Sequence, residues 1–179
     1  MELRQKKIDV QRSWLNIGVL QMCITAVFMA LTCIATMIIQ IPIPLGYAHL
    51  GDSVILICTF FFGPAAGALA GGIGSAMADI LSGYAVWALP TLLIKTLMPV
   101  IAYAFFRQRE WKCRVFSFKS IAGAVAALLF MTAGYVVFGA VLYGSAGAGI
   151  ASAPGLLMKS AVNLAVYLFV AAGISKVRN

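Results

Sequence analysis

The feature that most constrains this chain is an apolar run, residues 14–39, that contains no charged side chain. The run is longer than the roughly 20 residues that a helix needs to cross the hydrocarbon core of a bilayer. Soluble globular domains are about half apolar and about a quarter charged. This chain is 63% hydrophobic and 10% charged, so a water-soluble fold is poorly supported. We expect a protein of the lipid bilayer with no room for a separate catalytic domain.

Prolines, glycines and basic stretches divide the chain into six apolar segments. Because proline cannot continue a helix, Pro42 and Pro44 end the first segment and open a loop. The Gly63-Pro64 pair predicts the turn between the second and third. The expected spans are residues 14–39, 52–62, 65–81, 85–106, 121–143 and 155–174. This pattern predicts an all-α membrane protein, a single domain over 1–179 with six transmembrane helices, of which the second and third are short.

The positive charges indicate the orientation. Eleven of the thirteen Lys and Arg residues lie in 1–13, in 107–119 and in the C-terminal tail. The connections 40–50, 82–84 and 144–153 contain none. Since cytoplasmic loops are enriched in Lys and Arg, both ends are expected inside the cell (N-in/C-in), with 107–119 cytoplasmic and 40–50 extracellular. The same rule explains the net charge of +8 better than nucleic-acid binding does.

Four ionisable residues lie within or at the ends of the apolar spans: Asp52, Asp79, Lys95 and Lys159. A charge at the bilayer centre costs at least about 2.5–3.5 kcal/mol, so each needs a partner or a polar cavity. One interpretation is two Asp–Lys pairs that fix helix packing. The other is a polar pocket in the outer half of the bundle, which we favour because all four lie centrally or toward the predicted outer side.

Two predicted helices each carry polar and aromatic residues on one face. On the fourth span these are Tyr84, Trp87, Thr91 and Lys95, and on the sixth they are Lys159, Asn163 and Tyr167. An aromatic ring beside hydroxyl and amine groups suits a small planar ligand. An interfacial aromatic belt would explain Tyr84 and Trp87 alone, but it does not explain the lysines.

The loop 40–50 is a candidate lid over this site, since it is flanked by glycines and joined to the first span by two prolines. It carries Tyr47 and the single histidine, His49, as candidate ligand contacts, although a lone histidine is more often packed or solvated. On the first span, Ala26 and Ala30 form a small-residue face for close packing, either within the bundle or against another membrane protein.

Signals for catalysis or a bound metal are missing from the sequence. There is no Ser/His/Asp set, no H-E-x-x-H motif and no C-x-x-C spacing. The glycine-rich stretch 63–74 lacks the Lys-Ser/Thr ending of a P-loop. We therefore expect no catalytic residues, no cofactor and no metal site.

Several motifs together resemble the substrate-binding S component of energy-coupling factor transporters, in the riboflavin-type branch that includes hydroxymethylpyrimidine and pyridoxine members. They are Leu50-Gly-Asp-Ser-Val-Ile, Gly63-Pro-Ala-Ala-Gly67, Asp79, Gly83-Tyr84, Trp87, Thr91-x-x-x-Lys95 and Ala26-x-x-x-Ala30. The resemblance covers nearly the whole chain.

The resemblance implies a vitamin-binding subunit in a bacterial cell membrane, working with a transmembrane coupling subunit and two cytoplasmic ATPases. It implies that Ala26 and Ala30 contact the coupling subunit, and that Tyr47, His49, Trp87, Lys95, Lys159 and Asn163 line the site. Hydroxymethylpyrimidine, pyridoxine and riboflavin are all compatible, and a single small ring is preferred.

Two other functions remain open from the sequence. One is a stand-alone secondary or proton-coupled transporter that uses Asp52 or Asp79 with a lysine partner as a proton relay. The other is an envelope assembly protein whose polar residues only lock helix packing.

Overall fold

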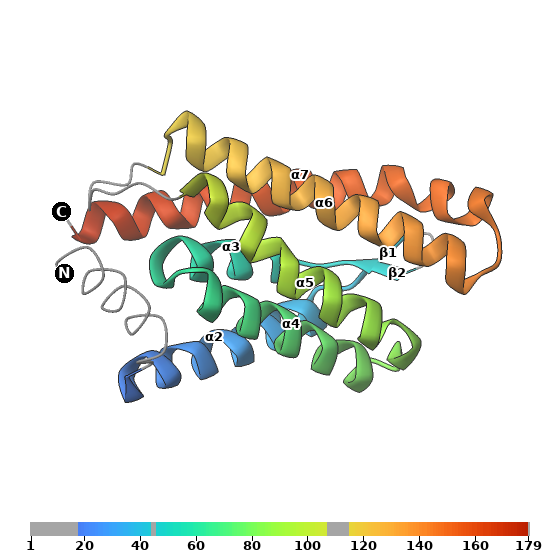
Figure 1. Cartoon of the computed structure of the whole chain (residues 1–179), viewed down its shortest axis with the longest axis horizontal. Coiled ribbons are helices and arrows are strands. Elements are labelled where there is room, and N and C mark those ends of the chain that lie inside the picture. Colours follow the sequence, from blue (N-terminus) through green and yellow to red (C-terminus); the bar gives the residue numbers. More distant parts are fainter. Residues whose placement is uncertain (1–17, 44–45, 107–114, 179) are drawn as a thin grey trace, which may run out of the picture.

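The computed structural model describes residues 18–43, 46–106 and 115–178, which form a bundle of helices (Figure 1). The helices are α2 (Val19–Ile38), α3 (Gly51–Phe62), α4 (Pro64–Leu81), α5 (Ala85–Phe106), α6 (Phe118–Leu142) and α7 (Ala146–Arg178). Two short antiparallel strands, β1 (Ile41–Ile43) and β2 (Gly46–Ala48), lie between α2 and α3. The predicted helical class is confirmed.

Five of the described helices are long and apolar enough to cross a membrane, namely α2, α4, α5, α6 and α7. The sixth, α3, has 12 residues. A helix of that length spans about 18 Å, which is less than the roughly 30 Å hydrocarbon core. The chain is thus a multi-pass membrane protein, while six crossings and the N-in/C-in orientation stay predictions.

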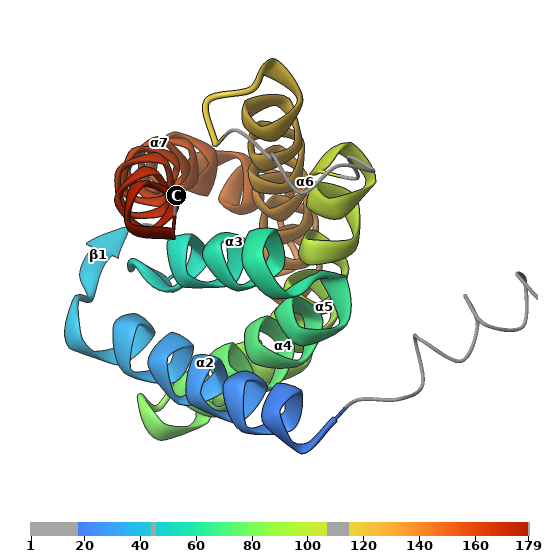
Figure 2. The same cartoon turned by 90° about the vertical axis from the view of Figure 1, so that its left-hand side faces the viewer.

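The short helix α3 occupies the centre of the bundle, in contact with α2, α4, α5 and α7 (Figure 2). All of its first nine residues except Val54 are buried. The glycines of α4 bring that helix close to its neighbours, as the small-residue pattern predicts. A Cβ on Gly71 would lie 2.8 Å from the Lys95 carbonyl oxygen, so only glycine fits there.

The connections gather at two ends of the bundle (Figure 1). The turns after α4 and α6 lie at the end toward which the β1–β2 hairpin is placed, which we call the hairpin end. The Gly63 turn, the last residues of α5 and the C-terminal end of α7 lie at the opposite end. Gly63 has φ +90°, a conformation that favours glycine, and Pro64 then starts α4 at a position that needs no N–H donor.

Three predicted loops differ from the structure. The segment 144–153 is mostly helical, because α7 begins at Ala146 and continues through Pro154. Alanine is the strongest helix former, and a proline near one end of a membrane helix removes only one hydrogen bond. Residues 118–119 belong to α6, and 40–50 contains the hairpin. Residues 1–13, the first residues of the predicted first span and 107–114 lie outside the described part.

Candidate functional site

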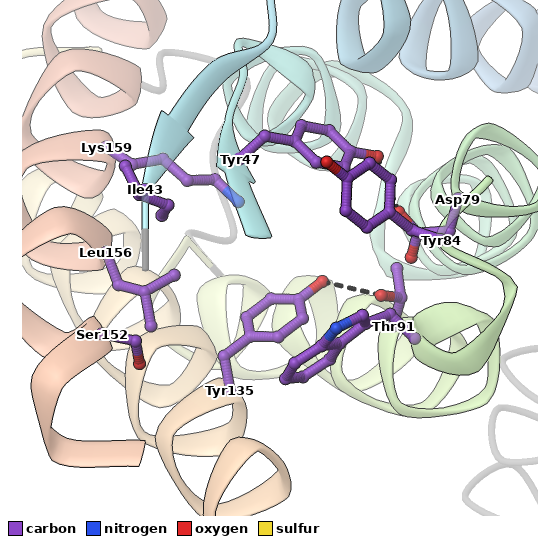
Figure 3. A pocket seen from close by; sticks show the side chains of 10 residues that line it. Ile43, Tyr47, Asp79, Tyr84, Thr91, Tyr135, Ser152, Leu156 and Lys159 are labelled. Atoms are coloured by element: carbon purple, nitrogen blue, oxygen red, sulfur yellow. Dashed lines mark hydrogen bonds between the residues drawn. The ribbon is translucent and has the colours of Figure 1, made fainter. Parts of the chain in front are cut away.

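A pocket opens at the hairpin end of the bundle, between the hairpin, α4, α5, α6 and α7 (Figure 3). It holds about 440 Å³ of empty space, its mouth included. It is lined by Ile43, Tyr47, Asp79, Tyr84, Trp87, Thr91, Tyr135, Ser152, Leu156 and Lys159. Tyr47 and Tyr84 lie on one side and Tyr135 lies on the other (Figure 3). The Trp87 ring is 5.8 Å from that of Tyr135, so the pocket has aromatic walls.

The polar face predicted on α5 is the wall of this pocket. Trp87 and Thr91 line it from successive turns of α5, and Tyr84 lines it from the residue just before the helix. Lys95 is one turn further along and is completely buried. The face therefore runs from the mouth of the pocket into the interior of the bundle.

Beneath the pocket, two lysines converge on one carboxylate. Lys95 forms a salt bridge with Asp52 Oδ1, and Lys159 Nζ lies 3.3 Å from Asp52 Oδ2. All three side chains are almost completely buried. Buried charges are tolerated only when they are paired, so this cluster replaces the two separate Asp–Lys pairs considered above. With all three ionised, the cluster carries one net positive charge beside the pocket.

His49 connects the chain after β2 to this cluster. Its Nε2 lies 2.9 Å from Lys159 Nζ, and its Nδ1 lies 3.0 Å from the Gly51 nitrogen. A neutral imidazole has one acceptor nitrogen, so its tautomer decides which of these two donors is bound. Burial lowers the pKa of His49 well below its usual range, and the Lys159 ammonium lowers it further, so the ring is neutral.

Asn163 holds the backbone around His49 in place. Its amide nitrogen donates to the His49 carbonyl at 2.8 Å, and its amide oxygen accepts from the Ser53 N–H at 2.8 Å. Non-helical backbone near lipid must find partners within the protein, and this one side chain supplies two of them. Asn163 does not line the pocket but positions the residues that frame it.

Asp79 anchors the hairpin from α4. Its Oδ1 accepts a hydrogen bond of 2.7 Å from the Tyr47 hydroxyl, and the Tyr47 ring lies 4.9 Å from that of Tyr84. Burial, followed by the charge of Asp79, raises the pKa of the Tyr47 hydroxyl, so this hydroxyl stays protonated and donating. The second oxygen, Oδ2, makes no hydrogen bond within the described residues.

Tyr135, on α6, joins the aromatic wall to the charged cluster. Its ring centroid lies 5.5 Å from Lys95 Nζ and 5.4 Å from Lys159 Nζ, within range of cation–π attraction. Its hydroxyl is 3.0 Å from that of Thr91, and its ring lies 5.8 Å from Trp87. A ligand ring stacked on Tyr135 would therefore contact an aromatic face that the Lys95 and Lys159 ammonium groups polarise.

The structure brings most of the predicted site residues together. Those that line the pocket are Tyr47, Tyr84, Trp87, Thr91, Lys159 and Asp79, while His49, Asp52, Lys95 and Asn163 lie in the network next to it. Ala26 and Ala30 are exposed on α2 and do not line the pocket.

Tyr167, one of the predicted site residues, does not line this pocket. It shares the buried face of α7 with Lys159, but eight residues of helix separate the two by about 12 Å. Its hydroxyl bonds to Ser120 at 2.9 Å, and its ring stacks on Phe106 near the opposite end. The spacing of four residues correctly predicts a shared face but not how far the pocket extends along it.

Four lining residues were missed by sequence reasoning: Ile43, Tyr135, Ser152 and Leu156. Tyr135 had a detectable signal, because a tyrosine in the middle of an apolar span needs a partner for its hydroxyl. Ser152 lay in a segment assigned to a loop. Ile43 and Leu156 are ordinary apolar residues, and only the packing of the hairpin on α7 places them here.

The described residues contain no group of three His, Cys, Asp or Glu side chains that could hold a metal ion. The donors and acceptors of the pocket are an ammonium, a carboxylate, hydroxyls and aromatic faces. Such groups bind and orient an organic ring.

Comparison with known proteins gives two matches. The family model for the S component of the ECF-type riboflavin transporter matches residues 16–176. An uncharacterized protein in a gap 3′ region of Pyrococcus woesei is 41% identical over 117 residues, which cover 64% of this chain and 75% of that protein.

Proposed function

We infer that this chain, which belongs to the family of ECF-type riboflavin transporter S components, binds a small vitamin or vitamin precursor for an ATP-driven importer. Family membership supports a substrate-binding transporter subunit rather than an enzyme. The finer assignment, to a ring-containing vitamin captured at the outer face of the cell membrane, rests on the pocket.

One observation carries the assignment: an aromatic-walled pocket lies above a buried Asp52–Lys95–Lys159 cluster. Aromatic walls bind a planar ring by stacking, and a few fixed polar groups orient it. A role in helix packing alone would explain the ion pairs. It would not explain why Lys159 and Asp79 also face an open space between four aromatic side chains.

The size of the pocket favours a single ring. The enclosed space is small, because the centre of a water-sized sphere can occupy only about 40 Å³ of it. Hydroxymethylpyrimidine and pyridoxine are therefore preferred substrates. Riboflavin, with three fused rings, would require the hairpin to move outward.

Coupling to ATP hydrolysis is proposed to use α2. Its buried residues are Thr25, Thr32 and Thr36, whereas Ala26 and Ala30 are exposed. Small exposed residues one turn apart allow another helix to approach closely. This face is proposed to dock on a transmembrane coupling subunit that works with two cytoplasmic ATPases.

Direct binding tests the proposal. Purified protein in detergent is titrated with hydroxymethylpyrimidine, pyridoxine and riboflavin by calorimetry, and one of them is expected to bind with nanomolar affinity. In proteoliposomes a proton gradient should leave that affinity unchanged, whereas a proton-coupled carrier would respond to it. In cells, depletion of the coupling ATPase should abolish uptake. Absence of binding to all three compounds would reject the vitamin assignment.

A further inference from the structure

Lys159 lines the pocket with an ammonium group that has few partners. Its Nζ lies 3.3 Å from Asp52 Oδ2, but that oxygen makes no hydrogen bond within the described residues. The one described hydrogen bond of the ammonium is made to His49 Nε2, at 2.9 Å. The Tyr135 ring, 5.4 Å from Nζ, attracts the charge without fixing its direction. The direction of the pocket lysine therefore depends on His49.

The other ring nitrogen of His49, Nδ1, faces the start of α3. It lies 3.0 Å from the Gly51 nitrogen, whose N–H is directed at it, and 3.5 Å from the Thr36 hydroxyl oxygen on α2. The Gly51 N–H is the first of α3, and such a group has no acceptor within its own helix. The N-cap residue, Leu50, supplies no side-chain cap. The imidazole thus meets an ammonium at one nitrogen and a backbone N–H at the other.

Close packing holds the ring between these donors. His49 is 7% exposed. A Cβ on Gly51 would lie 2.2 Å from the Thr36 hydroxyl oxygen and 3.0 Å from His49 Nδ1, so the three residues are in tight contact. Asn163 donates to the backbone carbonyls of both His49 and Lys159, which fixes the two main chains relative to each other. The ring therefore responds to its neighbours mainly by the choice of the nitrogen that carries its proton.

The two donors compete for one lone pair. A ring protonated at both nitrogens would direct N–H groups at the Gly51 N–H and at the ammonium, and a neutral ring accepts at one nitrogen only. Hydrogen bonds from a charged donor are roughly twice as strong as neutral ones. Lys159 should therefore win, so that Nε2 accepts and the proton lies on Nδ1. The Thr36 hydroxyl can accept from Nδ1–H, whereas the Gly51 N–H is left without its acceptor.

Resting on the proposed function, we propose that His49 is a positioning residue for Lys159. Its Nδ1–H tautomer holds the ammonium at the pocket through Nε2, and the first N–H of α3 stays uncapped as a consequence. His49 acts through the lysine rather than by touching the vitamin. Where the ammonium is absent, the ring takes the Nε2–H tautomer and caps α3 through Gly51. The ring exchanges its proton with water, so it carries one proton in either form.

NMR can read this tautomer directly, because His49 is the only histidine in the sequence. Full-length protein is labelled with 15N-histidine, purified through an affinity tag that contains no histidine, and kept in detergent at neutral pH. Long-range 1H–15N spectra distinguish the protonated ring nitrogen from the unprotonated one. The wild type should hold the Nδ1–H tautomer in about tenfold excess or more, although histidine in water prefers the Nε2–H form. A wild-type ring in the Nε2–H form would overturn the proposal.

Two lysine variants test which ammonium controls the ring. Lys159→Met keeps a long side chain but removes the donor, so the Nε2–H tautomer should become the major form. Lys95→Met is the matched control, because Lys95 pairs with Asp52 and makes no described hydrogen bond to His49. Its ring should stay in the Nδ1–H form. The same tautomer in both variants would contradict control by Lys159. If a variant does not fold, the wild-type spectrum still decides the tautomer.

Binding measurements separate positioning from direct contact. His49→Gln supplies an amide oxygen that can accept from Lys159, whereas His49→Leu supplies no acceptor. Hydroxymethylpyrimidine, pyridoxine and riboflavin are titrated in turn by calorimetry. His49→Leu should weaken binding about tenfold, and His49→Gln should recover most of that loss. An equal loss in both variants would overturn the positioning role. If none of the three compounds binds the wild type, the proposed function fails, while the NMR comparison still decides whether His49 holds Lys159.

Discussion

The two ends of the bundle share helices but differ in packing: one contains a pocket with polar groups, and the other contains a close-packed apolar core. At the hairpin end, α5 and α7 contribute Trp87 and Lys159 to the pocket, and α5 contributes Lys95 to the charged cluster beside it. At the opposite end, the same two helices contribute Phe106 and Tyr167 to an apolar core that also includes α6. Close-packed apolar side chains fill the opposite end. The hairpin end keeps an empty pocket beside paired buried charges. The pocket that forms the candidate site is therefore confined to one half of the bundle.

The largest expected effect comes from the charged cluster. Asp52→Ala leaves two buried lysines without their carboxylate, and breaking a buried ion pair in this way costs about 3–5 kcal/mol. The free energy of unfolding, measured by denaturant titration in mixed micelles, should fall by that amount. Asp79→Asn is the matched control, since no described salt bridge includes Asp79. A smaller loss for Asp52→Ala than for this control would show that the cluster does not hold the hairpin end together.

Trp87→Ala should separate binding from stability. Trp87 is 5% exposed and forms part of the pocket wall. Removal of an aromatic binding residue costs about 2 kcal/mol or more, so affinity for the vitamin should fall roughly thirtyfold or further. Calorimetric titration measures this change. Phe106→Leu, in the opposite core, serves as a control that should change unfolding but not affinity.

Tyr167→Phe should lower stability but leave vitamin affinity unchanged. The substitution removes the hydroxyl that bonds to buried Ser120 and keeps the ring that stacks on Phe106. Leaving a buried hydroxyl unpaired costs about 1–3 kcal/mol of unfolding free energy. Vitamin affinity, measured in the same preparation, should stay within twofold of the wild type. A large loss of affinity would mean that the pocket reaches further along α7 than the structure shows.

A pH dependence of stability is expected from His49. Its pKa in the folded protein lies well below the usual value because the ring is buried beside Lys159. The unfolded chain therefore binds more protons as the pH falls below about 6.5, and stability should drop by about 1 kcal/mol between pH 6.5 and 5.5. Above the unfolded pKa this contribution is constant. The difference between the wild type and His49→Gln over this range isolates the effect, and parallel curves would contradict it.

The smallest effect on stability is expected on the exposed face of α2. Ala26→Leu adds volume at an exposed position, so the free energy of unfolding should change by less than about 0.5 kcal/mol. Vitamin affinity should also be unchanged. ATP-dependent uptake should nevertheless decrease, because the larger side chain separates α2 from the coupling subunit. Normal uptake would place the docking surface elsewhere.

Much of the site could be predicted because charges within apolar spans are rare and need partners. Lys95 and Lys159 were recognisable for this reason, and helical spacing connected them to Trp87 and Asn163. The choice of partner was not predictable, since either aspartate lay within reach of either lysine. Packing decided it: α3 carries Asp52 into the centre of the bundle, between the two lysines, while Asp79 meets Tyr47 from the hairpin.

The sequence by itself determined that this chain is a helical membrane protein and which helix faces are polar, because hydrophobic length and helical period are local properties. Only the tertiary structure decided where along those faces a pocket opens, and that Tyr135, Leu156 and Ile43 help to enclose it. Tyr167 lies on the predicted face yet outside the pocket, since the extent of a cavity depends on what every neighbouring helix contributes at that depth. The neighbouring helices are far apart in the chain, so no local sequence pattern encodes where the cavity ends.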